Sequence, residues 1–167
     1  MANDMDFTKA QINCSQKIMK CTENSISFEL KNPNQKNAKL YSVDGNLIKG
    51  TGVKKCDYMY EIFSDGVAIK NINQNLHDDA FISSKLKSFI YVELKGKNFE
   101  RAVEQIEQTA VQLNTRHSSC SERLGFVVCS TTRHPNFSTK DQMLKAKLMK
   151  VHRIKLKIES RKATFSI

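Results

Sequence analysis

One stretch constrains the fold of this chain more than any other: residues 89–96, with the sequence Phe-Ile-Tyr-Val-Glu-Leu-Lys-Gly. β-branched and aromatic residues dominate it and a glycine ends it, which is typical of a buried strand. Two charged residues, Glu93 and Lys95, lie within it. Because alternate residues of a strand point to the same face, a carboxylate and an ammonium group emerge side by side. Burying them is costly unless they are paired or bind a metal ion, and the alternative is an edge strand on which both are solvated.

The segments on either side of this stretch favour a site. Residues 55–62 predict a second short strand that opens on Asp57. A long amphipathic helix follows the central stretch, with Asn98 as its expected N-cap. The apolar residues that mark its sheet-facing side are Phe99, Ala102, Val103, Ile106, Ala110 and Leu113. Gln105 and Thr109 are four residues apart and therefore share a face of this helix.

Three short motifs occur in order along the chain: Cys56-Asp57-Tyr58, then Val92-Glu93-Leu94-Lys95-Gly96, then Ala102-x-x-Gln105-Ile106-x-x-Thr109. Together they resemble the PD-(D/E)xK, or restriction-endonuclease-like, nuclease superfamily, over about residues 43–130. Cys56 stands where the superfamily name has proline, a position that varies widely among its members. The resemblance implies an α/β fold with a mixed central sheet flanked by helices. It also implies that residues 1–167 form one domain, as a small stand-alone member.

The resemblance assigns a chemistry to five residues. Asp57, Glu93 and the backbone carbonyl of Leu94 would hold Mg²⁺ or Mn²⁺, which prefers oxygen ligands and needs only one or two carboxylates from the protein. Lys95 would orient or deprotonate the attacking water and stabilise negative charge on the phosphoryl group. Gln105 would reach the catalytic pocket from the helix; the alternative is an ordinary exposed glutamine. The implied activity is metal-dependent hydrolysis of phosphodiester bonds in DNA, in defence, repair or recombination.

The net charge of +10 is concentrated near the end of the chain. From residue 133 onward there are ten Lys and Arg but only two acidic residues. A basic surface attracts phosphate backbones, although a solvated lysine face is the alternative. The candidate contacts to nucleic acid are Lys54, Lys55, Lys145, Lys147, Lys155 and Lys157.

Other partners and functions remain open. Superfamily members include homodimers and proteins that act beside a partner protein. The same fold can also bind nucleic acid or a protein without cutting, and an unrelated α/β interaction module can contain Glu-x-Lys by chance. With no tryptophan and four tyrosines, a stacking platform for single strands is weakly supported.

Several classes are disfavoured by composition. The polar N-terminus does not resemble a signal peptide, and no apolar run approaches the ~20 residues that span a membrane. Five cysteines without a C-x-x-C pair argue against a zinc site and a disulfide framework, and suit the reducing cytoplasm. Motifs of other enzyme classes are absent. The four histidines, predicted to be surface residues, are His77, His117, His134 and His152.

The remaining segments predict further helices and strands. Residues 6–21 predict a first helix, and Asp44-Gly45-Asn46 between two apolar runs predicts a hairpin. A helix is expected to end near Lys150, with an inward face made by Met143, Leu144, Leu148 and Val151. Alternation in residues 153–159 predicts a strand that closes the chain as a hairpin with residues 163–167.

Overall fold

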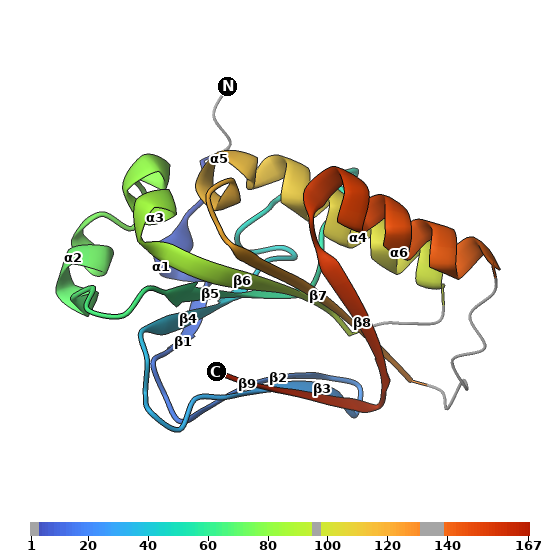
Figure 1. Ribbon diagram of the computed structural model, residues 1–167, viewed down its shortest axis with the longest axis horizontal. Helices are drawn as coiled ribbons and strands as arrows, with labels where there is room; N and C mark the ends of the chain where they lie inside the picture. The colour runs from blue at the N-terminus through green and yellow to red at the C-terminus, as the bar shows by residue number, and fades with distance from the viewer. Residues whose placement is uncertain (1–3, 95–97, 131–138) are drawn as a thin grey trace.

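A six-stranded mixed sheet is the middle layer of the fold, and helices cover one of its faces while a second sheet covers the other (Figure 1). The computed structural model describes residues 4–94, 98–130 and 139–167. Within these residues the six-stranded sheet consists, in spatial order, of β1 (Gln11–Cys14), β4 (Ala38–Ser42), β5 (Tyr58–Phe63), β6 (Leu86–Glu93), β7 (Glu122–Cys129) and β8 (Lys155–Ser160). The first four strands are antiparallel, and β6, β7 and β8 are parallel.

The other elements lie on the two faces of this sheet. The described helices are α1 (Phe7–Ala10), α2 (Ile69–Gln74), α3 (Asp79–Lys85), α4 (Phe99–Gln112), α5 (Asn114–His117) and α6 (Thr139–His152). The second sheet contains β2 (Ile18–Glu23), β3 (Ile26–Lys31) and β9 (Lys162–Ser166), in the order β2-β3-β9. The expected α/β fold with a mixed central sheet is therefore confirmed. Its helices lie mainly over one face, because the small second sheet occupies the other.

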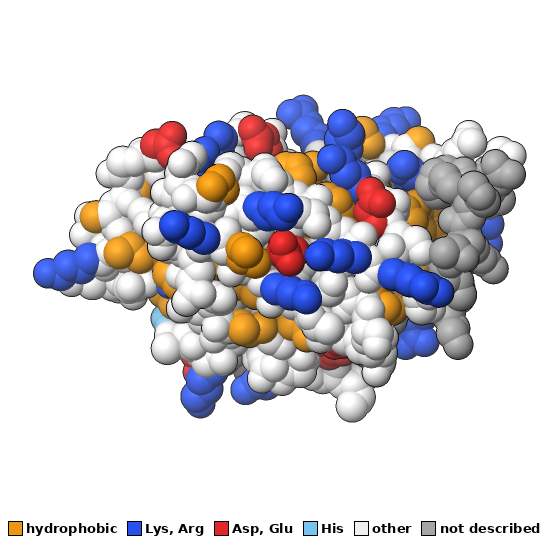
Figure 2. Space-filling model, turned by 90° about the horizontal axis from the view of Figure 1, so that it is seen from below, with side chains coloured by type: hydrophobic (Ala, Val, Ile, Leu, Met, Phe, Trp, Pro, Cys, Tyr) orange, Lys and Arg blue, Asp and Glu red, His pale blue; other side chains and the backbone are white. Residues whose placement is uncertain are grey.

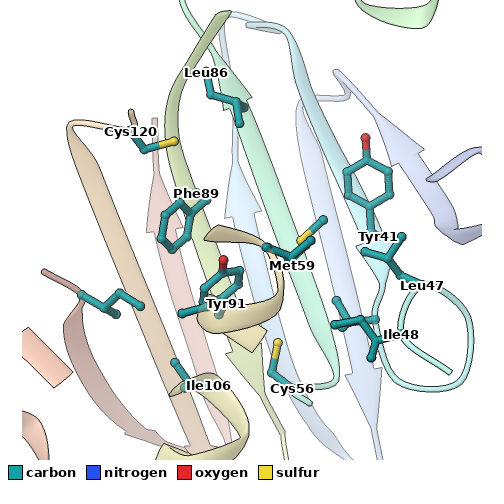
Figure 3. Packing of buried hydrophobic residues seen from close by; sticks show 14 of the residues in the cluster. Tyr41, Leu47, Ile48, Cys56, Met59, Leu86, Phe89, Tyr91, Ile106 and Cys120 are labelled. Atoms are coloured by element: carbon teal, nitrogen blue, oxygen red, sulfur yellow. The ribbon is translucent and has the colours of Figure 1, made fainter. Parts of the chain in front are cut away.

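The apolar side chains form two cores, one on each side of the central sheet. The core under the helices contains Met59, Phe89, Tyr91 and Ile106, whose side chains converge between the sheet and α4 (Figure 3). The core between the two sheets is built around Phe28, whose ring packs against other aromatic rings. Each strand in the middle of the sheet is thus buried on both faces, which accounts for continuous apolar runs in the sequence.

The predicted central strand is confirmed for residues 89–93, which belong to β6, whereas Lys95 and Gly96 lie outside the described residues. It pairs with β5 on one side and with β7 on the other, so it is not an edge strand. After β6 the chain forms α4 and returns as the parallel strand β7, the crossover expected for a strand, helix, strand sequence. Asn98 caps α4 as predicted, because its side chain accepts a hydrogen bond from the Arg101 backbone N–H at 3.1 Å.

The predicted first helix is wrong beyond its first turn. Only α1 is helical, and β1 and β2 follow it directly. In β2 the buried Met19 and Cys21 alternate with the exposed Ile18 and Lys20, a period of two that belongs to a strand. The helical stripe in this segment was imperfect because the residues serve a sheet.

Both predicted hairpins are also wrong. At Asp44-Gly45-Asn46 the chain makes a local turn, in which the Leu47 and Ile48 N–H groups donate to the Val43 carbonyl. Strand β4 pairs instead with β1 and β5. At the end of the chain, β9 leaves β8 and pairs in parallel with β3. These pairings join segments far apart in sequence, so no local turn signal reports them.

The last helix buries less than its sequence pattern indicates. Of the predicted inward residues of α6, Leu148 is buried, but Met143 and Val151 are 67% and 58% exposed. This helix rests mainly on α4 rather than directly on the sheet (Figure 1). A helix that packs on one neighbour needs only a narrow apolar stripe, so the outer residues of the pattern face solvent.

Gly125 permits a close approach of side chains in the middle of β7. A Cβ atom at this position would lie 3.1 Å from Leu156 Cδ1 and 3.3 Å from Ile154 Cγ2. We expect Gly125→Val to lower the free energy of unfolding by about 1–3 kcal/mol through overpacking. Gly52→Val is the control, since nothing lies within 4 Å of a Cβ there. Urea unfolding of both variants tests this, and equal midpoints would show that the strand has room to spare.

Candidate active site

The paired strands β5 and β6 place Asp57 and Glu93 beside each other. Tyr58 lies opposite Val92 in this antiparallel pair, so Asp57 and Glu93 occupy the next position of the same register. Residues opposite each other in such a pair point to the same face of the sheet. Both carboxylates are buried, with 3% and 1% of the residue surface exposed. The structure thus brings together the two acidic residues that the sequence motifs predict.

These two carboxylates lie on the face that the helices cover. Met59 and Tyr91, two residues from Asp57 and Glu93 along their strands, belong to the core under the helices. Because side chains two apart share a face, the carboxylates point toward α4. The backbone N–H of Leu94 donates to Asp57 Oδ2 at 2.8 Å, which ties the start of β5 to the end of β6.

Helix α4 holds the chain just before Asp57 through two side chains. The Cys56 N–H donates to Thr109 Oγ1 at 2.9 Å, and Gln105 Nε2 donates to the Lys55 carbonyl at 3.0 Å. The predicted residue Gln105 is therefore near the site, but its side-chain amide is hydrogen-bonded to the Lys55 carbonyl. It acts as a positioning residue for the Asp57 segment and is not an ordinary solvated glutamine.

The Cys56 thiol responds to the charges of both carboxylates. Burial raises its pKa above the ordinary range, and the negative charges of Glu93 and Asp57 raise it further, against the lowering effect of a hydrogen bond with Thr109. A thiol with a raised pKa stays protonated at neutral pH and is a poor nucleophile. Cys56 therefore belongs to the structural surroundings of the two carboxylates.

The donor types at this site fit a hard divalent cation. Within the described residues, no group of three or more His, Cys, Asp and Glu side chains converges as a metal site. Mg²⁺ does not require such a group, because it usually takes one or two carboxylates and fills its octahedron with water and phosphate oxygens. Asp57 and Glu93 meet this need. Lys95, predicted to complete the site, lies outside the described residues.

The six lysines predicted to contact nucleic acid do not share one surface. Lys54 forms an ion pair with Glu104, and Lys147 lies 3.3 Å from Glu107 Oε1. On the opposite side of the molecule, Lys155 is exposed and the Lys157 ammonium lies over the rings of Phe126 and Phe165.

Lys55 and Lys145 are the other two lysines of this set. Lys55 is only 8% exposed, and its ammonium donates to the Gly50 carbonyl at 2.6 Å. Lys145 lies on α6. Figure 2 shows that Lys and Arg side chains are spread over the underside of the molecule, which carries the β2-β3-β9 sheet, with few acidic side chains among them.

A second cluster of charged residues, which the sequence motifs do not predict, is buried at the other end of β5. Glu61 is fully buried and accepts hydrogen bonds from Arg116 Nε at 2.5 Å and Nη2 at 3.0 Å. His117 Nε2 lies 2.8 Å from Glu61 Oε1, and His117 Nδ1 lies 2.6 Å from the Tyr91 hydroxyl. The prediction that His117 is a surface residue is therefore wrong, since this residue is only 2% exposed.

This cluster is a closed network. Arg116 Nη1 donates to the Leu76 carbonyl at 2.8 Å and to Asp79 Oδ1 at 3.2 Å, and the ring of Phe7 lies 3.7 Å from its guanidinium carbon. Every guanidinium nitrogen thus has a partner within the fold. Such saturation joins α1, α3 and α5 to β5 and indicates a structural role. A sequence signal for Glu61 existed, because it is a charged residue inside the apolar run of β5, on the same face as Asp57.

No described helix is both long and apolar enough to cross a membrane. Comparison with known proteins adds no relative: no protein-family model matches the chain, and no curated protein or solved structure matches it significantly. What can be inferred about the activity therefore depends on the geometry of Asp57 and Glu93.

Proposed function

We propose that the protein is a metal-dependent nuclease that hydrolyses phosphodiester bonds in DNA. The observation that carries the proposal is the placement of Asp57 opposite Glu93 at the adjoining ends of β5 and β6, beneath α4. The order of the elements, with antiparallel strands, then a helix and a parallel strand, supports the likeness to restriction-endonuclease-like proteins. The site lies at the adjoining ends of two central strands rather than in the middle of the sheet.

Each residue has a defined part in the proposed reaction. A bound Mg²⁺ or Mn²⁺ supplies Lewis-acid activation of the scissile phosphate and of a water molecule. Asp57 and Glu93 would hold that cation through their carboxylate oxygens, and the Leu94 carbonyl would provide a further oxygen of the type it prefers. Lys95 orients the attacking water and stabilises the negative charge that develops on the phosphoryl oxygens. Gln105 keeps the Asp57 segment in place through the Lys55 carbonyl.

One observation favours a second function, nucleic-acid binding without cleavage. Both carboxylates are almost fully buried, and Asp57 Oδ2 already accepts the Leu94 N–H. A carboxylate that accepts a hydrogen bond from a backbone N–H can also have a purely structural role. In that case the fold presents basic residues to nucleic acid or another surface to a protein partner, and metal ions have no effect on it.

Cleavage assays separate these functions. We expect the wild-type protein to cut plasmid or single-stranded DNA only with Mg²⁺ or Mn²⁺. Glu93→Gln and Lys95→Ala are each expected to lower the rate by about 100-fold or more, because each removes a group that acts on the reacting atoms. Lys87→Ala, which changes an exposed lysine at the start of β6, is the matched control and should cut normally.

A second measurement keeps this test decisive if the substrate is not the right one. A retained metal site stabilises the folded state in proportion to the logarithm of metal concentration above Kd. We expect Mg²⁺ or Mn²⁺ to raise the melting temperature of wild-type protein but not of Glu93→Gln. Cutting that survives both substitutions would place the activity elsewhere, and absence of both metal stabilisation and cutting would leave the binding function.

The proposed setting is the cytoplasm. All five cysteines are free thiols, which are kept in that state by a reducing compartment.

A further inference from the structure

We propose that the cleft between the 50–55 loop and α4 binds the phosphodiester backbone of the nucleic acid next to the cutting site, with Arg101 as its main phosphate contact. The cleft has a volume of about 530 Å³ and is lined by the loop, by Asp44 and by Arg101 and Gln105 of α4. This inference takes the identity of the polymer from the proposed nuclease function. The position of the cleft, however, is a property of the fold alone.

The cleft adjoins the candidate active site through the backbone. Its loop leads directly into Cys56 and Asp57, and Gln105, which lines the cleft, holds the last residue of the loop by donating to the Lys55 carbonyl. A strand of nucleic acid that places one phosphate at Asp57 therefore extends over the loop to place a neighbouring phosphate in the cleft.

Contacts of Lys55 close the loop internally. The Lys55 ammonium reaches back to the Gly50 carbonyl at 2.6 Å and lies 3.4 Å from Asp44 Oδ1. Gly50 has a φ of +108°, a conformation that residues with a side chain rarely adopt. Gly52 has open space around the position of a Cβ atom. A loop that is closed by an internal lysine and lined by glycines allows close approach of a phosphate to its backbone.

Arg101 is the cation that remains for a ligand. Of the other cations lining the cleft, Lys54 is paired with Glu104, and Lys55 is engaged inside the loop. Within the described parts of the chain, the exposed Arg101 side chain forms no ion pair, and it lies in the first turn of the fourteen-residue α4, where the helix dipole favours anions. An arginine fork can donate two hydrogen bonds to one phosphate.

The larger neighbouring cleft is a poorer site for a polyanion. It lies between α4 and α6, has a volume of about 650 Å³, and is lined by three glutamates, Glu100, Glu104 and Glu107. These glutamates form ion pairs with Lys54, Lys140 and Lys147. Both lysines that line this cleft, Lys54 and Lys147, are paired with these glutamates, so among the described residues it offers a phosphate no unpaired cation, whereas the 50–55 cleft offers Arg101.

The lining also indicates the kind of recognition. None of the described residues that line the 50–55 cleft is aromatic, so bases cannot stack there. Contacts to phosphate alone carry no sequence information. The cleft therefore fits the backbone of DNA or RNA of any sequence.

Binding can be measured without cleavage. Fluorescence anisotropy with a labelled single-stranded oligonucleotide and its duplex, in EDTA, gives Kd for wild-type protein between about 50 and 200 mM salt. We expect Arg101→Glu to weaken binding at least about tenfold and to reduce the slope of log K against log salt by about 1. Lys87→Glu is the charge-matched control on an exposed lysine at the opposite end of the sheet. It should leave the slope unchanged.

The outcomes distinguish the cleft from the nuclease function. Equal losses in Arg101→Glu and Lys87→Glu would overturn the inference, since only the overall charge would then matter. Failure of the wild-type protein to bind either oligonucleotide at 50 mM salt would overturn it as well. If Arg101→Glu alone weakens binding while no metal supports cutting, the cleft stands and the proposed nuclease activity fails.

Discussion

Arg116→Ala is expected to lower the free energy of unfolding by about 3–5 kcal/mol, the cost of leaving a buried charge without its partner. The substitution removes the two hydrogen bonds that hold the Glu61 carboxylate, which is fully buried. It also frees the Leu76 carbonyl, which Arg116 Nη1 binds at 2.8 Å, and leaves a cavity beside the ring of Phe7. Burial is the largest single influence on the pKa of Arg116 and lowers it, but the charge of Glu61 and the hydrogen bonds to Glu61 and Asp79 together raise it by more, so the guanidinium is charged.

Urea unfolding followed by circular dichroism measures the change. The control is Arg101→Ala, which removes the same side chain from an exposed position on α4 and should alter the free energy of unfolding by no more than about 0.5 kcal/mol. If Arg116→Ala were no more harmful than Arg101→Ala, the network would not support the fold. Should Arg116→Ala fail to fold, the milder Arg116→Lys keeps the charge but loses the fork, and it should still unfold at lower urea than wild type.

A double-mutant cycle isolates the pair itself. Glu61→Ala and Arg116→Ala each leave a buried charged or polar group without its partner, whereas the double variant removes both side chains. We expect the double variant to be destabilised by clearly less than the sum of the single variants, because the residues contact each other directly. Additive losses would mean that the cost comes from packing and not from the ion pair.

Glu61 of β5 and Asp57, just before this strand, point to one face, and under the proposed function they have different roles. Asp57 lies at the end where the strands give way to loops, next to the 50–55 cleft. Glu61 lies at the other end, enclosed by α1, α3 and α5, with Arg116 and His117 as partners. The closed network fixes one end of β5 and so helps to hold the other end in register with β6.

The central part of the fold could be predicted because its signals are local. The apolar run of β6, the Asn98 cap and the helical stripe of α4 each report one element. The adjacency of Asp57 and Glu93 follows once the two strands are antiparallel neighbours. The role of Gln105 is only half predictable: its spacing shows which face of α4 it occupies, but not that the Lys55 carbonyl lies there.

The second sheet and the buried network depend on contacts between distant segments. Ser27 pairs with Lys162 across almost the whole chain, and no turn or periodicity predicts such a parallel pairing. Likewise, the polar residues around His117, after the apolar stripe of α4, predict a surface loop from the sequence alone. His117 is buried because the ring of Phe89 in β6 stacks on its ring, with the centroids 4.7 Å apart, and because Glu61 in β5 provides a hydrogen-bond partner.

The second large effect expected of this network is a loss of stability in acid. Burial by itself would raise the pKa of Glu61, but the charge of Arg116 and hydrogen bonds from His117 and Arg116 outweigh it and hold the pKa at about 2. Burial is also the main cause of the lowered pKa of His117, against the raising effect of Glu61. Glu61 is thus ionised and His117 neutral in the folded protein at neutral pH.

Both shifts have the same sign in a stability measurement. Each folded-state pKa is lower than the value in the unfolded chain, so the unfolded state binds more protons as the pH falls, and acid favours unfolding. The contribution of His117 is fully present above pH 6.5 and declines as the pH falls toward its lowered folded-state pKa. That of Glu61 is present above pH 4.5 and is lost as the pH falls to about 2. The Glu61 shift alone corresponds to on the order of 3 kcal/mol.

Urea midpoints measured from pH 7 down to pH 3 test this directly. We expect the midpoint of wild-type protein to fall modestly below pH 6.5 and steeply below pH 4.5, the ordinary values for His and Glu. Glu61→Gln should be less stable at pH 7 and lose less on acidification, since it has no carboxylate to protonate. His77→Asn, at a histidine whose side chain is 55% exposed, is the control and should follow the wild-type profile. If Glu61→Gln retained the full wild-type slope below pH 4.5, other carboxylates would govern acid unfolding, and the Glu61 network would not be its source.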